Sequence, residues 1–166
     1  MKILMVCLGN ICRSPIAEGV LAHKIRQYGL EWEVASAGTN GYHIGEPPHP
    51  YSRKVCLMNG IDISAQRARR FTALDLERYD RIYAMADDVI HDIRSIARGH
   101  AALHKVDYFL NELHPGSNAS VPDPWYGDED GYLPVYEMIE QTCDAIIRKY
   151  AGISSEKDYF HSLNSR

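Results

Sequence analysis

The sequence predicts an α/β fold: a single-domain, four-stranded parallel sheet flanked by helices on both faces. Short apolar runs alternate with longer stretches of helical periodicity, which is typical of parallel βαβ units with right-handed crossovers. The chain has 166 residues, a length at which one domain buries a sizeable core. Because no repeat or linker divides the chain, we expect one domain over residues 1–153. Residues 154–166 are polar and are expected to form a disordered tail.

The elements follow in order from the pattern of apolar residues. The buried run at residues 2–6 is the first strand, and residues 14–28 form a helix with Val20 and Leu21 on its apolar face and Gly29 as its stop. Further strands are expected at residues 33–36, 81–85 and 106–109. Further helices are expected at residues 51–59, 72–78, 87–97 and 133–150. This order predicts a flavodoxin-like three-layer sandwich.

Composition and charge exclude several classes of protein. The residues are 45% hydrophobic and 24% charged, as in an ordinary globular protein. A net charge of -4 and a pI near 6.0 argue against nucleic-acid binding. The first apolar run ends at Gly9, too early for a signal peptide or a membrane span. The four cysteines have neither disulfide-framework nor zinc spacing. We therefore expect a cytoplasmic monomer that binds no nucleic acid, membrane, metal or cofactor.

The most informative segment is the loop between the first expected strand and the first expected helix. A loop in this place collects free backbone N–H groups, and the helix N-terminus adds positive potential there. The result is an anion cradle that suits a phosphate group. Gly9 and Asn10 tolerate a positive φ, which a loop wrapped around an anion requires.

Three polar side chains in this loop predict chemistry. Cys7 stands next to a helix N-terminus and an arginine, both of which favour a thiolate, so it is a candidate nucleophile. Arg13 carries a planar fork of N–H donors that can hold two phosphate oxygens at once. Ser14 occupies the N-cap position, and its hydroxyl could donate to the Cys7 sulfur. A cysteine at a strand end is often only a small buried hydrophobe, but its spacing from Arg13 favours catalysis.

A second candidate segment is the long irregular stretch at residues 111–131. Long connections inside a compact domain are usually functional. Asp123 lies there between two prolines and is followed by Trp125 and Tyr126. Asp123 is either a general acid above the cradle, with the two aromatic residues as a substrate wall, or part of a solvated acidic turn. The residues alone leave both interpretations open.

The segment Val-Cys-Leu-Gly-Asn-Ile-Cys-Arg-Ser-Pro at residues 6–15 resembles the signature loop of the low-molecular-weight protein tyrosine phosphatases. Residues 123–127, Asp-Pro-Trp-Tyr-Gly, are similar to the general-acid loop of that family. Supporting matches extend over residues 36–39, 45–48, 60–62 and 68–69. The resemblance implies hydrolysis of phosphotyrosine in protein substrates through a cysteinyl-phosphate intermediate, with a tyrosine kinase as a partner.

The resemblance also implies a role for each site residue. Cys7 is expected to be the nucleophile, Arg13 the phosphate ligand and Asp123 the general acid. The phosphate-binding and supporting residues are expected to be Leu8, Gly9, Asn10, Ile11, Cys12 and Ser14. The walls of the substrate pocket are expected to be Ile11, Tyr42, Trp125 and Tyr126.

Cys12 and Gln66 raise separate questions. The resemblance implies a reversible disulfide between Cys12 and Cys7 that protects the nucleophile, and the alternative for Cys12 is simple packing. The family usually has a histidine at the position of Gln66 that supports the loop asparagine, and we expect the Gln66 amide to donate to Asn10 instead. Arg67, Arg69 and Arg70 are expected to form a solvated basic face, with an acidic partner as the alternative. His100 and His104 have an i, i+4 spacing that could suit a metal, but without a third ligand nearby they are expected to be surface histidines.

A few residues distinguish a tyrosine phosphatase from four other functions that the loop could suggest. An arsenate reductase of the same fold needs a downstream cysteine pair, whereas Cys56 and Cys143 are far apart. A phosphoarginine phosphatase typically has threonine at the position of Ile11, so the apolar residue favours phosphotyrosine. A binding module without catalysis could lack both Cys7 and Asp123, which are present. A nucleotide-binding P-loop would require a Gly-Lys-Ser/Thr ending that the loop lacks.

Overall fold

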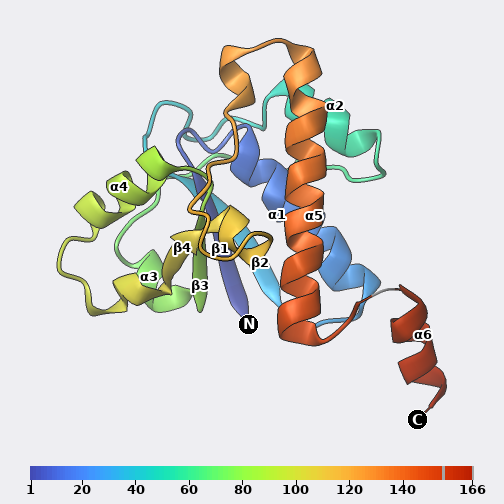
Figure 1. The fold of residues 1–166 in the computed structure, drawn as a ribbon. Helices are drawn as coiled ribbons and strands as arrows, with labels where there is room; N and C mark the ends of the chain where they lie inside the picture. Colours follow the sequence, from blue (N-terminus) through green and yellow to red (C-terminus); the bar gives the residue numbers. More distant parts are fainter. Residues whose placement is uncertain (155, 166) are drawn as a thin grey trace.

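The computed structural model describes residues 1–154 and 156–165 and contains a four-stranded parallel sheet with helices on both faces (Figure 1). The sheet order is β2-β1-β3-β4. The strands are β1 (Lys2–Cys7), β2 (Glu33–Gly38), β3 (Arg81–Ala84) and β4 (Val106–Tyr108). The predicted fold is confirmed, but β2 is longer than expected because its pairing with β1 continues to Cys7 and Gly38.

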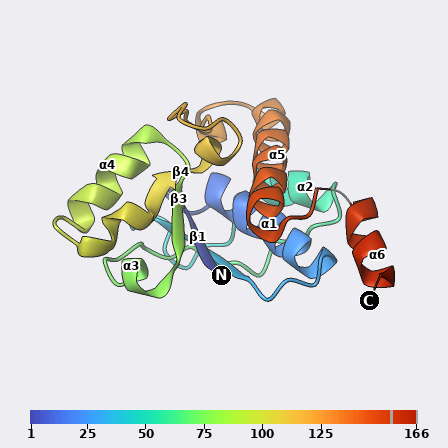
Figure 2. The same ribbon diagram turned by 60° about the horizontal axis from the view of Figure 1, so that its bottom comes forward.

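The helices form two groups on opposite faces of the sheet (Figure 2). One face carries α1 (Arg13–Gln27), α2 (Pro50–Leu57) and α5 (Tyr132–Ala151), and the other carries α3 (Asp75–Arg78) and α4 (Asp87–Ile96). Alternate residues of β1 serve the two cores: Ile3 and Met5 pack in one, and Leu4 and Val6 in the other. Burial on both faces explains why this strand is a continuous apolar run.

Several boundaries differ from the expected ones for local reasons. The helix α3 begins at Asp75, three residues later than predicted, and the Asp75 carboxylate accepts a hydrogen bond from the Thr72 N–H in the turn before the helix at 2.9 Å. Short 3-10 turns lie within the stretch expected to be irregular, residues 111–131, and shortly before it. All such turns that the structure describes are η1 (Ala101–Lys105), η2 (Phe109–Glu112), η3 (Pro124–Tyr126) and η4 (Glu129–Gly131).

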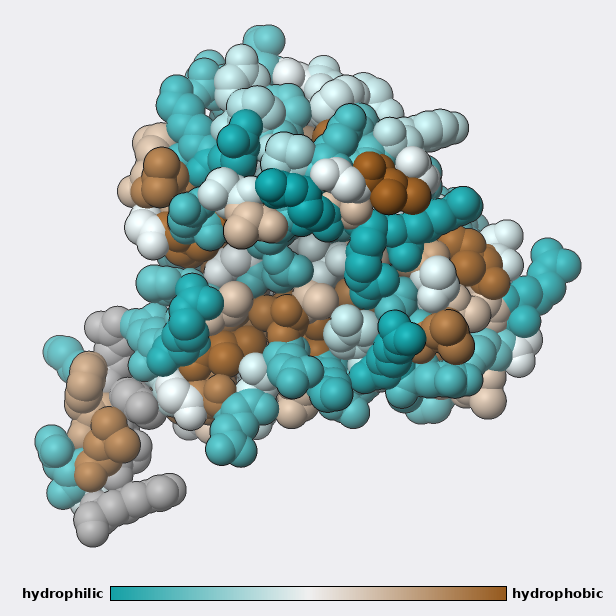
Figure 3. All heavy atoms as spheres, turned by 180° about the vertical axis from the view of Figure 1, so that it is seen from behind, coloured by the Kyte–Doolittle hydropathy of each residue, from teal (hydrophilic) through white to brown (hydrophobic). Residues whose placement is uncertain are grey.

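The tail corrects one expectation. It was expected to be disordered, but it contains the helix α6 (Glu156–Asn164), which stands apart from the sheet in both ribbon views (Figures 1 and 2). From behind, hydrophilic residues cover most of the surface, and hydrophobic residues gather in smaller areas (Figure 3). No helix in the described part of the chain has both the length and the apolar composition needed to cross a membrane.

Candidate active site

The cradle lies at the carboxyl end of β1, the edge at which open parallel sheets bind their ligands. Cys7 ends this strand and is 2% exposed, and Arg13 begins α1. Asn10 turns the loop between them with a φ of 58°. Backbone N–H groups of residues 8–12 donate to no acceptor within the described residues. These free donors, together with the N-terminus of α1, form a cradle for an anion.

The start of the loop after β2 holds the cradle in shape. The N–H of Thr39 donates to the Cys7 carbonyl, and the N–H of Asn40 donates to the Leu8 carbonyl, both at 3.0 Å. A Cβ added at Gly38 would lie 2.7 Å from the Leu8 carbonyl oxygen. Because this close approach leaves no room for a side chain, only glycine allows β2 to support the cradle from below.

The Asn10 side chain connects the loop to three other segments. Its Oδ1 accepts from the Arg69 backbone N–H at 3.0 Å, and its Nδ2 donates to Ser14 Oγ at 2.8 Å and to Ser36 Oγ at 2.9 Å. Ser14 Oγ also lies 2.9 Å from Cys7 Sγ. Since Ser14 Oγ accepts from Asn10, its own proton is free to point to the sulfur. The predicted contact between Ser14 and Cys7 is present.

Gln66 does not take the place that we expected. Its Nε2 donates to the Pro15 carbonyl at 3.1 Å, and its Oε1 is buried without a hydrogen-bond partner in the described part of the chain. The expectation that Gln66 supports Asn10 is therefore wrong. The Arg69 backbone accounts for the contact with the Asn10 carbonyl oxygen.

Arg69 also departs from its expected role as a solvated residue. Its guanidinium makes two hydrogen bonds to the Asp75 carboxylate, at 3.1 and 3.0 Å, and Asp75 is 1% exposed. Such a bidentate pair orients the segment that carries the Arg69 amide. The sequence showed only a run of arginines and contained no signal for this pairing.

Glu18 is a further support that the sequence analysis missed. Burial raises the pKa of this carboxyl group from 4.5 to about 6, while hydrogen bonds from Ser36 and the charge of Arg69 oppose the shift. Ser36 in turn receives the Asn10 amide. Glu18 therefore stands at the outer end of a hydrogen-bonded chain that leads through Ser36, Asn10 and Ser14 to Cys7.

We expect Glu18→Gln to stabilise the protein at neutral pH. A carboxyl group with a raised pKa in the folded state favours folding below pH 4.5, and this contribution is lost as the pH rises through about 6. The variant should therefore gain at most about 2 kcal/mol of unfolding free energy at pH 7.5 and almost nothing at pH 4. Urea unfolding at both pH values measures the difference. An equal gain from Glu31→Gln, at an exposed position, would contradict the burial argument.

Arg13 is anchored from two sides and keeps one donor free. Its side chain is 3% exposed, and Nη1 donates to the Val121 carbonyl at 3.0 Å. Nη2 lies 3.3 Å from Asp123 Oδ2. Nε is buried and has no hydrogen-bond partner among the described residues. A buried donor without a partner is costly, so Nε is ready to bind an anion in the cradle.

Asp123 belongs both to a turn and to the site. Its Oδ1 accepts from the Trp125 N–H at 3.1 Å, which caps the turn η3. Its Oδ2 faces Arg13, and its side chain is 21% exposed. The carboxyl group is thus a turn cap and also a member of the site. Cys7, Arg13 and Asp123 line one pocket of about 190 Å³.

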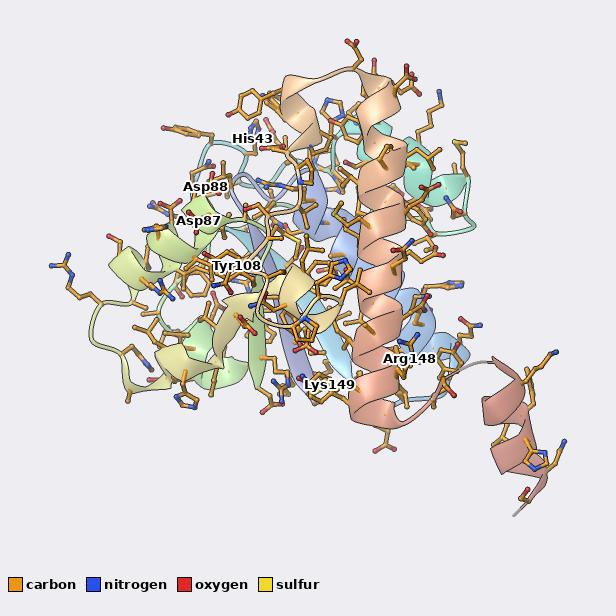
Figure 4. The ribbon with its side chains drawn as sticks, in the orientation of Figure 1. His43, Asp87, Asp88, Tyr108, Arg148 and Lys149 are labelled. Carbon is orange, nitrogen blue, oxygen red and sulfur yellow. The ribbon has the colours of Figure 1, made fainter. Side chains whose placement is uncertain are left out.

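The pocket walls contain all four residues that we expected and two that we did not. Tyr42 and Tyr126 are largely exposed at the rim, and Trp125 is half exposed. The complete lining is Cys7, Leu8, Gly9, Ile11, Cys12, Arg13, Asn40, Tyr42, His43, Asp123, Trp125 and Tyr126. His43 and Asn40 were missed, and the only signal for them was their place next to Tyr42. Figure 4 shows His43 in the loops beyond the carboxyl ends of the strands.

Cys12 is close to the reacting region but differs from Cys7 in its surroundings. It is 4% exposed, and its Sγ lies 3.5 Å from the Tyr132 hydroxyl. Burial raises the pKa of the Cys12 thiol to about 12, although the Tyr132 hydroxyl acts in the opposite direction. Cys12 is therefore a protonated thiol at neutral pH and is unsuited to be the first nucleophile.

We expect mild peroxide to inactivate the protein reversibly through a disulfide between Cys7 and Cys12. Peroxide oxidises Cys7 to a sulfenic acid, and the Cys12 sulfur then attacks it and expels water. Because the pKa of Cys12 is raised, this second step should be faster at alkaline pH. Recovery of activity with dithiothreitol is measured for the wild type and Cys12→Ser. Equal recovery would show that Cys12 only packs.

The remaining cysteines and histidines lie outside this site. Cys56 and Cys143 are buried and free, and burial raises the pKa of both thiols. His100 is not a simple surface residue, because its Nδ1 accepts from the Ala102 N–H and caps η1. No group of three or more metal-binding side chains is present within the described residues.

The sheet topology, the free loop amides and the adjacent Cys7 and Arg13 define the class of the protein: a phosphatase whose phosphate-binding loop carries a cysteine. The chain belongs to the family described as low molecular weight phosphotyrosine protein phosphatase, whose model matches residues 2–157.

Individual relatives agree with this family. The low molecular weight protein-tyrosine-phosphatase YfkJ of Bacillus subtilis is 35% identical over 158 residues, which cover 94% of this chain and 97% of the relative. The structure of a protein tyrosine phosphatase from Entamoeba histolytica has a TM-score of 0.84 at 32% identity and covers 92% of this chain and 97% of its own. A Drosophila arginine phosphatase has a TM-score of 0.83 at 25% identity, with coverages of 90% and 98%.

Proposed function

We propose that this protein hydrolyses phosphotyrosine in protein substrates, with Cys7 as the nucleophile and Asp123 as the general acid. The observation that carries the proposal is the convergence of the free loop amides, the Cys7 sulfur and the unpaired Arg13 Nε on one pocket. The amides and the guanidinium bind an anion, the sulfur attacks it, and the carboxyl group supplies a proton.

The first step transfers the phosphoryl group to sulfur. The Cys7 thiolate attacks phosphorus in line, an S–P bond forms, and the bond between phosphorus and the aryl oxygen breaks. Asp123 gives its proton to the departing phenolate oxygen. The amides of residues 8–12 and the Arg13 guanidinium hold the other three oxygens, where negative charge develops.

The second step releases phosphate. The Asp123 carboxylate removes a proton from water, whose oxygen attacks phosphorus as the S–P bond breaks. The departing sulfur becomes a thiolate again. The Ser14 hydroxyl, which lies 2.9 Å from Cys7 Sγ, donates to this thiolate and favours its departure.

The pocket walls support an aromatic substrate. Ile11 is an apolar wall residue, and Tyr42 and Trp125 offer ring surfaces against which a phenyl ring can pack. The Ile11 side chain has no acceptor for a guanidinium group, which a phosphoarginine substrate would present. Because the structure is also similar to an arginine phosphatase, phosphoarginine is the alternative substrate with which phosphotyrosine should be compared.

Turnover of three matched peptides tests the proposal. The peptides share one sequence and carry phosphotyrosine, phosphoserine or phosphoarginine. We expect kcat/KM to be highest for phosphotyrosine, by at least about 100-fold over phosphoserine. In the Ile11→Thr variant, the ratio of kcat/KM for phosphotyrosine to that for phosphoarginine should be smaller than in the wild type. A higher kcat/KM for phosphoarginine in the wild type would contradict the proposed substrate and leave the cysteine mechanism open to the other tests.

We further propose that the protein acts as a monomer in the cytoplasm, where it removes phosphate that a tyrosine kinase has added. The four cysteines are free thiols, a state that suits a reducing compartment. We also propose that residues 1–153 are the catalytic domain. Sedimentation of the full chain and fractionation of cells measure the oligomeric state and the compartment.

A further inference from the structure

Two histidines enclose the Trp125 side chain at the mouth of the pocket. The His43 ring centroid lies 5.6 Å from that of Trp125, with the planes tilted by 59°. The His49 ring lies 5.5 Å from Trp125 in an edge-on arrangement at 83°. His43 comes from the loop after β2, and His49 immediately precedes α2. Both histidines belong to the connection between β2 and α2, so the indole contacts a segment far from it in sequence.

His43 is itself fixed against the cradle. Its Nδ1 lies 2.5 Å from Glu46 Oε2. A Cβ added at Gly9 would lie 3.0 Å from His43 Cδ2, so the ring rests against the cradle loop at a residue without a side chain. Its position lets the ring contact the loop on one side and Trp125 on the other.

His49 is anchored even more firmly. Its backbone N–H donates to the Ile11 carbonyl in the cradle at 2.8 Å. Its Nδ1 accepts from the Tyr51 N–H at 3.1 Å as the N-cap of α2, which requires an unprotonated Nδ1. Its ring stacks on Tyr132 at 5.4 Å and 20°. Burial and the charge of Arg53 lower the pKa of His49, which favours the neutral ring.

The short turn that carries Trp125 connects this enclosure to the general acid. The Trp125 N–H donates to Asp123 Oδ1, so the indole and the carboxyl group belong to one turn. The end of the turn is open: Tyr126 is 82% exposed. The two histidines therefore provide the ring contacts between this turn and the cradle within the described residues.

We propose that His43 and His49 are positioning residues that hold Trp125, and through it Asp123, in place above the cradle. The proposal rests on the proposed function, because it assigns the two histidines to the proton-transfer step. A wall that only binds the substrate ring would act equally on all aryl phosphates. Residues that position the general acid instead affect the rate most for substrates whose leaving group needs a proton.

The experiment compares His43→Asn, His49→Asn and the double variant. Asparagine removes the ring in each case, and at position 49 it retains the acceptor that caps α2. His91→Asn is the matched control, because His91 is exposed on α4 and away from the pocket lining. Each variant is assayed with aryl phosphates whose leaving phenols span a wide range of acidity, and again in an Asp123→Asn background.

We expect the double variant to lower kcat/KM about tenfold for the poorest leaving groups and less than about twofold for the best. In the Asp123→Asn background the same substitutions should cause no further loss, because their effect passes through Asp123. Each single variant should show part of the loss, and His91→Asn none. Equal losses for all leaving groups, or an undiminished loss in the Asp123→Asn background, would overturn the proposal.

A fluorescence measurement tests, without catalysis, whether His43 and His49 hold the Trp125 side chain. The chain has two tryptophans, so a Trp32→Phe background isolates Trp125. Acrylamide should quench Trp125 more strongly in the double variant than in the parent or in His91→Asn. Unchanged quenching would show that the histidines do not hold the indole. If the wild type cleaves no aryl phosphate, the proposed function fails. The quenching measurement still decides whether His43 and His49 hold Trp125.

Discussion

We expect Cys7→Ser to abolish turnover and to leave phosphate binding nearly intact. The amides of residues 8–12 and the Arg13 guanidinium hold the anion without help from sulfur. A serine hydroxyl at this position has no general base to remove its proton, because its neighbour Ser14 offers only a hydroxyl. We expect a loss of kcat of at least about 10⁴-fold. Steady-state assays measure this loss, and competition by inorganic phosphate or calorimetry measures the binding.

A second cysteine provides the control for Cys7→Ser. Cys56 is equally buried but lies in α2 and outside the pocket lining. Cys56→Ser should therefore cost stability and leave kcat nearly unchanged. Activity of Cys7→Ser within about tenfold of the wild type would remove Cys7 from the role of nucleophile. Loss of phosphate binding would show that the sulfur also shapes the cradle.

We expect Asp123→Asn to slow the hydrolysis of aryl phosphates with poor leaving groups far more than that of phosphates with good ones. A general acid contributes about 10²–10⁴-fold when the leaving oxygen needs a proton, and little when it does not. Asparagine keeps the Oδ1 acceptor for the Trp125 N–H, so the turn η3 retains its cap. The slope of log kcat/KM against the pKa of the leaving phenol measures the effect.

Asp128 is the matched control for this substitution. It is an exposed carboxylate in the same segment, outside the pocket lining. Asp128→Asn should leave the slope unchanged, since a distant surface charge interacts weakly across water. A uniform loss for every leaving group in Asp123→Asn would instead assign Asp123 to the anchoring of Arg13, whose Nη2 lies 3.3 Å from it.

The sequence by itself determined the sheet and the cradle, because both depend on local order along the chain. The run at residues 2–6 is apolar throughout, and it becomes the central strand that both cores bury. Cys7, Asn10 and Arg13 are separated by a few residues, so one strand end, one turn and one helix start bring them together. Alternation of apolar and helical segments was sufficient to predict the parallel sheet.

Only the tertiary structure decided which distant residues support and cover the cradle. The contact between Asn10 and Arg69 joins positions 59 residues apart, and that between Arg13 and Asp123 joins positions 110 apart. Spacing along the chain carries no information about such pairs. Gln66 illustrates this limit: its amide was expected at Asn10, but it donates to the Pro15 carbonyl instead.

The same limit applies to His43 and His49. Each looks like an ordinary loop histidine in the sequence, and its contact with Trp125 exists only once the loop between β2 and α2 meets the loop that carries Trp125. The physical reason is that parallel strands end at one edge, so the loops that follow them converge there whatever their separation in sequence. Local pattern therefore predicted that Cys7 lies at the end of the first strand beside Arg13, and packing of the converging loops decided where Asp123 lies.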